Sequence, residues 1–428
     1  MRSDFVKGVM VHRKRNPLGK SLKKTGQVTF GGSPDFLLIL LVRIFLWFWF
    51  LRFNLKYDKS GLKGCKRPYI LIANHPSTLD AFLIARGVNP LHTNYVASQS
   101  FFRVPILKFL LGRVGAIPKA HTQKDIQSLR LMMKALAAGR VLMVCPEGRR
   151  SLDGTGSRFT DAMAKFVKKT GLPVVAAMIS GTYLAWPRWA DQAHPLPLTV
   201  SFRKILEPAE LSILTVSEIH ERMLDALRFD EFRAGRETRN GGRNHCLAEK
   251  IERLLHLCPC CGKWEAIKGR ENSIICQYCG ASAIMEPEGT IRRVSGSLAQ
   301  WPQVPAWYAL QRDAMSEAMR DPAFLIEAGV SCLNCTTDPG KPLVPMGPGH
   351  VSLGRKGLHY LGQADGIPLD ISFPISLMDT LPVSLGHFFE ICDETGTYWQ
   401  FRLQDERKEV QFEQYSDIHL HGEVEHDV

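Results

Sequence analysis

The sequence of 428 residues lacks the composition of several large protein classes. Its 35 glycines and 25 prolines follow no period, which excludes collagen. Hydrophobic residues make up 45% of the chain and charged residues 22%, which excludes an intrinsically disordered protein. The 11 cysteines are not scattered as a disulfide framework but include Cys-X-X-Cys pairs, which indicates metal-bound thiolates in a reducing compartment. The length allows two to four domains, each with its own core.

Acidic residues are outnumbered, with 42 Asp and Glu against 54 Lys and Arg and a formal net charge of +12. Such a charge favours anionic partners: phospholipid, a phosphorylated substrate or nucleic acid. Eight of the basic residues lie within residues 1–26, beside a single Asp. The rest of the chain is only mildly basic, so we expect no nucleic-acid binding.

The longest apolar segment, residues 36–53, is short for a transmembrane helix and is interrupted by Arg43 and Arg52. Its cluster of Trp47, Phe48 and Trp49 is typical of an anchor at the level of the lipid headgroups. We therefore assign residues 1–54 to a basic N-terminus and a membrane-associated helix that lies in the interface, on the cytoplasmic face. A buried core helix and a single span are the alternatives. No small-residue cleavage site follows the segment, so we expect no cleavable signal peptide.

Residues 55–231 alternate between apolar runs and amphipathic segments, which predicts an α/β domain. The predicted strands are residues 69–73, 141–145, 174–179 and 198–205. The predicted helices are residues 125–138, 160–170 and 216–232. Polar motifs follow the first two strands, where α/β folds bind their ligands.

The first motif contains His75 and Asp80, and the second contains Glu147, Arg149 and Arg150. A histidine accepts a proton near neutral pH when a carboxylate holds its tautomer, so the first pair is a candidate general base. Arginines on a Gly-containing loop suit a phosphate. The alternatives are a structural cap for the first pair and a solvated turn for the second.

Together these motifs resemble the glycerolipid acyltransferases typified by 1-acylglycerol-3-phosphate acyltransferase. Asn74, His75, Ser77 and Asp80 match the first block of that family. The third block, usually Pro-Glu-Gly-Thr-Arg-Ser, stands here as Pro146-Glu147-Gly148-Arg149-Arg150-Ser151, and the fourth resembles Leu172-Pro173-Val174-Val175. The second block begins as Gly115-Ala116-Ile117-Pro118, but no Arg follows, and the nearby substitutes are Lys119, His121 and Lys124. The resemblance covers residues 55–230.

The resemblance implies that His75, oriented by Asp80, deprotonates the free hydroxyl of a lysophospholipid, which then attacks the thioester of acyl-CoA or acyl carrier protein. The expected acceptor is 1-acylglycerol-3-phosphate and the product phosphatidate; the alternatives are glycerol 3-phosphate, an amino-acid lipid, or a non-catalytic lipid-binding adaptor. No catalytic cofactor is expected, and Cys145 is not expected to act as a nucleophile. The substrate-binding residues implied are Asn74, Ser77, Lys119, Glu147, Gly148, Arg149 and Arg150.

After a polar linker (residues 232–247), residues 248–290 resemble a rubredoxin-type zinc ribbon that begins with a short helix at 248–257. Its two knuckles are Cys258-Pro259-Cys260-Cys261-Gly262 and Cys276-Gln277-Tyr278-Cys279-Gly280. Each knuckle offers two thiolates to one tetrahedral ion. The expected ligands of a structural zinc (iron also suits such a site) are Cys258, Cys261, Cys276 and Cys279.

Residues 291–340 are predicted to be a helical connector with a helix at 306–320, and its Cys332 and Cys335 are interpreted as buried thiols, with redox or shared metal binding as alternatives. Residues 341–428 are predicted to be a β-rich domain that resembles a pleckstrin-homology or GRAM-type barrel. Its acidic and His-rich end, which includes Asp417 and His419, is expected to be a solvated tail. The predicted strands are residues 351–353, 357–361, 369–373, 387–392, 398–403 and 410–412.

Overall fold

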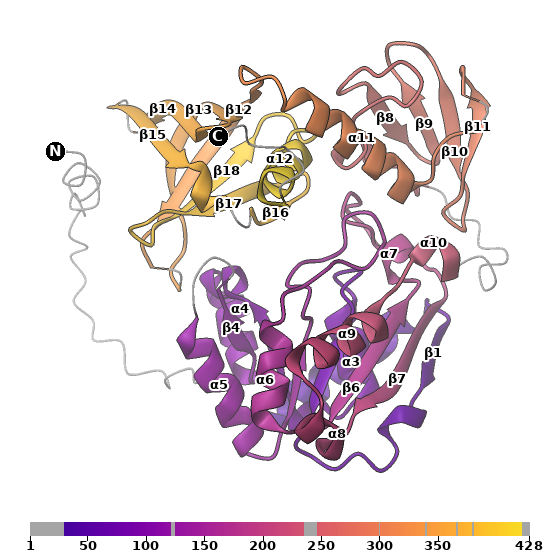
Figure 1. Cartoon of the computed structure of the whole chain (residues 1–428), viewed down its shortest axis with the longest axis vertical. Coiled ribbons are helices and arrows are strands. Elements are labelled where there is room, and N and C mark those ends of the chain that lie inside the picture. Colours follow the sequence, from indigo (N-terminus) through magenta and orange to yellow (C-terminus); the bar gives the residue numbers. More distant parts are fainter. Residues whose placement is uncertain are drawn as a thin grey trace.

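The computed structural model describes residues 30–120, 125–234, 246–298, 300–338, 340–364, 367–378 and 381–421 (Figure 1). The basic residues 1–26, together with His121 and Lys124, lie outside the described residues. Within them the strands form three sheets, which follow one another along the chain. In Figure 1 the first sheet and its helices lie below the other two sheets.

The first sheet has the order β1-β7-β6-β2-β5-β3-β4. Its strands pair in parallel except for β6 and β7, which are antiparallel. The four predicted strands are confirmed as β2, β5, β6 and β7, to within one residue at each end. Both β2 and β5 are buried along their whole length, which explains their unbroken apolar sequences. The bounds are β1 (Leu55–Asp58), β2 (Ile70–Ala73), β3 (Thr93–Ser98), β4 (Ile117–Lys119), β5 (Val141–Val144), β6 (Val174–Ser180) and β7 (Leu198–Leu206).

Helices cover this sheet and confirm two of the three predicted helices, as α5 and α6. The third is wrong at its end, because α9 stops at Leu227 and a short α10 follows. There the chain turns away to bond with another loop: Gly156 N donates to Phe229 O, and Glu231 N donates to Gly154 O. The bounds are α3 (Asp80–Gly87), α4 (Pro105–Arg113), α5 (Ile126–Ala137), α6 (Ala162–Thr170), α7 (Thr182–Ala185), α8 (Pro208–Ile213), α9 (Val216–Leu227) and α10 (Glu231–Ala234).

The apolar N-terminal segment forms the helix α2 (Phe36–Phe50). Ile39, Leu46 and Phe50 pack against the protein, whereas most of the other apolar side chains of this helix are exposed. In the part of the chain that the structure describes, no helix has the length and apolar character needed to cross a membrane.

The second sheet has four antiparallel strands in the order β11-β10-β9-β8. The predicted helix at 248–257 is wrong: the stretch is a series of turns with one 3₁₀ turn at Ile251–Arg253. Residues 251–257 are buried on all sides, so no face is left for solvent as a surface helix requires. The bounds are β8 (Ile267–Arg270), β9 (Ser273–Cys276), β10 (Ser282–Met285) and β11 (Ile291–Ser295).

The third sheet is antiparallel with the order β15-β14-β13-β12-β18-β17-β16, and it is flanked by α11 and α12. The region is therefore β-rich, as predicted, while the likeness to a pleckstrin-homology or GRAM-type barrel stays a prediction. The predicted helix at 306–320 is confirmed as α11, shifted by two residues. The bounds are α11 (Val304–Ala318), β12 (Ile326–Thr336), β13 (Val344–Gly354), β14 (Gly357–Ala364), β15 (Ile367–Pro374), β16 (Val383–Ser384), β17 (Phe388–Cys392), β18 (Tyr398–Leu403) and α12 (Glu409–His421).

Three predictions for this region need correction. Residues 410–412 are not a strand but the first turn of α12, whose Phe412, Tyr415 and Ile418 pack inward at helical spacing. Residues 291–340 are not only a helical connector, because β11 pairs with β10 and β12 pairs with both β13 and β18. Asp417 does not belong to a solvated tail, because it pairs with two arginines.

Candidate active site

His75 and Asp80 meet at the carboxyl end of β2. His75 Nδ1 lies 2.9 Å from Asp80 Oδ2, and the imidazole is 27% exposed whereas Asp80 is fully buried. An ionised carboxylate at Nδ1 makes that nitrogen the donor, so Nε2 carries the free lone pair. Within the described residues Nε2 has no hydrogen-bond partner, and it is therefore open to a substrate proton.

The carboxylate of Asp80 is held by two further donors. Ser77 N donates to Oδ2 over 2.8 Å, and Thr182 Oγ1 donates to Oδ1 over 3.1 Å. Burial raises the pKa of Asp80, while the hydrogen bonds from His75, Ser77 and Thr182 oppose that rise. The three donors fix the carboxylate in one orientation, and the carboxylate in turn fixes the imidazole.

Asn74 and Ser77 are fully buried and hold the loop after β2 in place. The Asn74 amide accepts from Ile179 N over 2.8 Å and donates to Ile179 O over 2.9 Å, which ties the loop to β6. Ser77 Oγ donates to Trp186 O over 3.0 Å. Both side chains therefore hold the loop through these hydrogen bonds, and a contact of either with the substrate stays a prediction.

Glu147, after β5, joins the second motif to the first. Its Oε1 accepts from His75 N over 3.2 Å, and its Oε2 accepts from Ser157 N over 3.1 Å. Burial raises the pKa of this carboxyl to about 7. The next residue, Gly148, has a φ of +71°, a conformation that favours glycine and lets the loop turn back toward His75. Ser151 N then donates to His75 O over 2.9 Å.

Arg150 lies beside the histidine motif, where its Nη1 donates to Thr78 Oγ1 over 2.7 Å. Burial and the neighbouring charge of Arg188 lower the pKa of Arg150 to about 10. Arg188 is only 8% exposed, and its Nη1 donates to Arg150 O over 3.3 Å. Within the described residues neither guanidinium has a carboxylate ion pair, so the two cations form a site that suits an anion.

Two other predicted substrate-binding residues lie elsewhere. Arg149 points to the third sheet region, where it pairs with Glu413 and Asp417 of α12. Lys119 is exposed at the end of the edge strand β4, and β5 and β3 lie between β4 and the β2 strand that leads to His75.

Sequence reasoning missed Thr182 and Arg188, which reach the site from the segment after β6. Thr182 had one available signal, because it follows a predicted strand of the same sheet at its carboxyl end. Arg188 had none. Cys145 follows β5, and burial raises the pKa of its thiol well above the usual value, which disfavours the nucleophilic thiolate.

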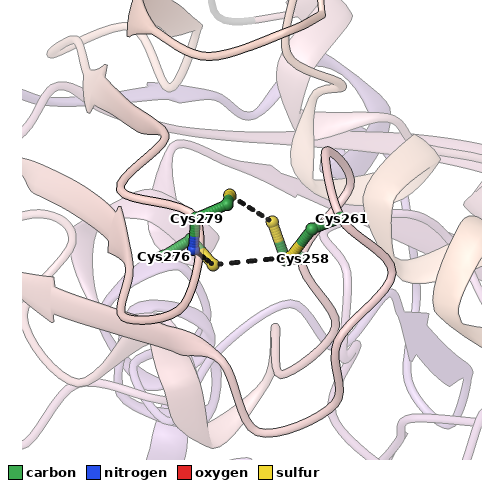
Figure 2. Close-up of side chains that lie close together, drawn as sticks. All are labelled: Cys258, Cys261, Cys276 and Cys279. Carbon is green, nitrogen blue, oxygen red and sulfur yellow. Dashed lines mark hydrogen bonds between the residues drawn. The ribbon is translucent and has the colours of Figure 1, made fainter.

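A separate cluster of four cysteines lies in the second sheet region, where the two knuckles face each other (Figure 2). The Sγ atoms of Cys258 and Cys279 are 3.8 Å apart, as are those of Cys261 and Cys276, and all four lie within 4.8 Å of one another. A tetrahedral ion with metal–sulfur bonds of about 2.3 Å holds its sulfurs roughly 3.8 Å apart. The cluster therefore fits a four-thiolate metal site. Cys332 and Cys335 lie apart from it on β12, and Cys335 is buried.

Known proteins match the first sheet region. The family model described as Acyltransferase matches residues 52–180, which lie in the part of the chain that has an α/β fold. The 1-acyl-sn-glycerol-3-phosphate acyltransferase of Limnanthes alba is 28% identical over 172 residues, which cover 40% of this chain and 60% of that protein. The protein of the same name from Saccharomyces cerevisiae is 28% identical over 176 residues, which cover 38% and 56%. These matches support the resemblance to glycerolipid acyltransferases.

The matches are partial. The chain spans less than two thirds of the length of these two relatives. The crystal structure of the 1-acyl-sn-glycerophosphate (LPA) acyltransferase PlsC from Thermotoga maritima is 23% identical, with a TM-score of 0.37, over 44% of this chain and 78% of that one. The family match ends at residue 180, before the cysteine cluster and the third sheet.

Proposed function

We propose that this protein transfers an acyl group from acyl-CoA or acyl carrier protein to the free hydroxyl of 1-acylglycerol-3-phosphate, which yields phosphatidate. The observation that carries the proposal is the His75–Asp80 pair, in which His75 Nε2 is open, together with the guanidinium of Arg150, which bonds to Thr78 and has no ion pair within the described residues. The shared name of the matched relatives supports the same reaction.

The reaction needs no protein nucleophile. His75 Nε2 takes the proton of the acceptor hydroxyl as its oxygen forms a bond to the thioester carbonyl carbon. The carbon–sulfur bond then breaks, and the imidazolium returns the proton to the leaving thiolate. Asp80 stabilises the imidazolium, which exists only during the reaction, so the pair favours the transition state over the ground state.

In this proposal the acceptor phosphate binds Arg150 and Arg188. An Arg presents a planar fork of donors that matches phosphate oxygens. Because the two cations are partly desolvated and repel each other, a bound dianion relieves that repulsion as well as accepting hydrogen bonds.

An acceptor panel tests the proposal. Purified protein receives a labelled acyl thioester with 1-acylglycerol-3-phosphate, glycerol 3-phosphate or a phosphate-free monoacylglycerol. We expect the highest kcat/KM for 1-acylglycerol-3-phosphate, and we expect Arg150→Gln to raise the KM for that acceptor but not for monoacylglycerol. Preference for glycerol 3-phosphate would reassign the acceptor. An equal effect of Arg150→Gln on both lipids would contradict phosphate recognition.

Membrane attachment on the cytoplasmic face is proposed from α2 and α4. The two helices adjoin, because Asp35 N donates to Arg113 O over 2.7 Å and the two side chains form an ion pair. Ile106, Leu107, Phe109 and Leu110 are exposed on α4. Such an exposed apolar surface suits insertion into a lipid interface, where a lysophospholipid resides. On α2 the exposed apolar residues are Phe36, Leu37, Leu40, Leu41, Ile44, Phe45, Trp47 and Phe48.

The four-cysteine cluster is proposed to hold a structural zinc ion. Two sulfurs belong to buried residues and two to exposed ones, and four thiolates leave no open coordination position for chemistry. The backbone supports the knuckles, since Cys279 N donates to Cys276 Sγ and Cys260 N donates to Cys258 Sγ, each over 3.4 Å.

A further inference from the structure

The third sheet region reaches the active-site loop through α12. Arg149 Nη1 lies 3.1 Å from Glu413 Oε1, and Arg149 Nη2 lies 3.3 Å from Asp417 Oδ1. Asp417 also pairs with Arg312 of α11. One end of this ion-pair network therefore lies in the loop that carries Glu147 and Arg150, and the other lies more than 260 residues further along the chain.

Glu413 is the buried partner of this ion pair, and Arg149 supplies its counter-charge. Glu413 is only 4% exposed, and its Oε2 has no hydrogen-bond partner, whereas Arg149 is 41% exposed. Within the described residues Arg149 is the one side chain that forms an ion pair with Glu413. Burial lowers the pKa of Arg149, but Glu413 and Asp417 outweigh it and leave that pKa raised. Without the guanidinium, a buried carboxylate would remain unpaired.

The residues on either side of Arg149 both belong to the loop beside His75. Arg149 lies between Gly148, whose φ is positive, and Arg150, which carries the proposed phosphate contact. A second link joins this loop to the third sheet region, because Arg188 donates hydrogen bonds to Arg150 O and to Val383 O of β16. Two separate elements of the third sheet region thus hold the same short loop.

The sequence comparison points the same way. The family match ends at residue 180, and Glu413 and Asp417, the partners of Arg149, lie in a region beyond it.

We propose that Arg149 is a positioning residue: its ion pair with Glu413 and Asp417 makes the C-terminal region part of the acyltransferase site by fixing the loop of residues 146–151, and with it Arg150. The inference deepens the proposed function and rests on it for the effect on turnover. It also replaces the expectation that Arg149 itself binds the acceptor phosphate.

A mutant cycle tests the proposal with Arg149→Thr, Glu413→Gln and the double variant. Arg149→Thr should lower the kcat/KM for the acceptor by about tenfold, mostly through the acceptor KM, and leave the KM of the acyl donor unchanged. Glu413→Gln alone should cost less, because it leaves no buried charge unpaired. The double variant should recover to the level of Glu413→Gln. The matched control is the surface pair Arg222–Glu210, where Arg222→Thr should change neither constant.

Hydrogen exchange gives a readout that does not depend on activity. The backbone N–H of Gly148 and that of Ser151 bond within the loop region, to Cys145 O and His75 O. We expect hydrogen exchange in residues 146–151 to be faster in Arg149→Thr than in the wild type. In the double variant, exchange should be slower than in Arg149→Thr. Unchanged exchange in Arg149→Thr would overturn the proposal. The proposal would also be overturned if the double variant had the same acceptor KM as Arg149→Thr, because that result is expected if Arg149 binds the phosphate directly. A wild type without acyl transfer would refute the proposed function instead, while the exchange experiment would still decide the role of Arg149.

Discussion

Replacing Asp80 by Asn tests the catalytic pair with little change in shape. Asp80 Oδ2 accepts from His75 Nδ1 and Ser77 N, and Oδ1 accepts from Thr182 Oγ1. The Asn oxygen can take the place of Oδ2, and its amide can donate to the Thr182 hydroxyl, which also accepts. The loop therefore keeps its hydrogen bonds, and the change removes a buried charge. We expect the melting temperature of Asp80→Asn to equal or exceed that of the wild type.

Turnover should fall steeply in Asp80→Asn. At the observed 2.9 Å, a carboxylate and an imidazolium attract by about 6 kcal/mol if the effective dielectric constant is about 20. Part of this is offset by solvation, so we expect a loss of about 10²- to 10⁴-fold in kcat, the usual contribution of general-base catalysis. The KM for the acceptor should change little, because the imidazolium forms only after binding.

The assay measures kcat and KM with a labelled acyl thioester, beside thermal unfolding of the same preparations. Asp80→Ala is the contrasting variant, since it leaves Ser77 N and Thr182 Oγ1 without their acceptor and should lower stability by about 1–3 kcal/mol for each buried donor. A kcat of Asp80→Asn within a few-fold of the wild type, in a folded protein, would refute the role of the carboxylate.

Three other predictions address the loop, the metal and the membrane. Because burial raises the pKa of Glu147 from 4.5 to about 7, its contribution to folding is present below pH 4.5 and is lost as the pH rises to about 7, a change of about 3 kcal/mol. Thermal unfolding of Glu147→Gln should therefore lack this loss, and parallel curves for the two proteins would contradict it. Cys276→Ser should lose one equivalent of zinc by elemental analysis and melt at a lower temperature, whereas Cys260→Ser, in the other knuckle and outside the cluster, should keep the metal. Replacing Trp47 and Phe48 together by Ser should weaken binding to anionic lipid vesicles in sedimentation at least several-fold without changing the melting temperature, and unchanged binding would oppose the interfacial helix.

The first sheet could be predicted because its buried strands are short apolar runs that polar motifs follow directly. His75 and Glu147 come at the ends of two such runs, and the carboxyl ends of neighbouring parallel strands lie together. Their bond, from His75 N to Glu147 Oε1, follows from that arrangement.

Contacts made by distant segments could not be predicted in the same way. Arg188 and Glu413 reach the loop through the packing of whole elements, and no local pattern marks them. Residues 410–412 fit a strand as well as a helix because three residues are too few to separate the two periods. The helical spacing becomes clear only with Tyr415 and Ile418 included.

The central claim is most directly tested by one comparison of the wild type with His75→Ala. Both proteins, in detergent or liposomes, receive 1-acylglycerol-3-phosphate and a labelled acyl group on CoA or on acyl carrier protein, and labelled phosphatidate is measured. We predict phosphatidate from the wild type and a rate lower by about 10²-fold or more from His75→Ala, with its lipid binding retained. Equal rates from the two proteins would contradict the assignment of His75 as the base, and no product from the wild type with either donor would contradict the proposed reaction.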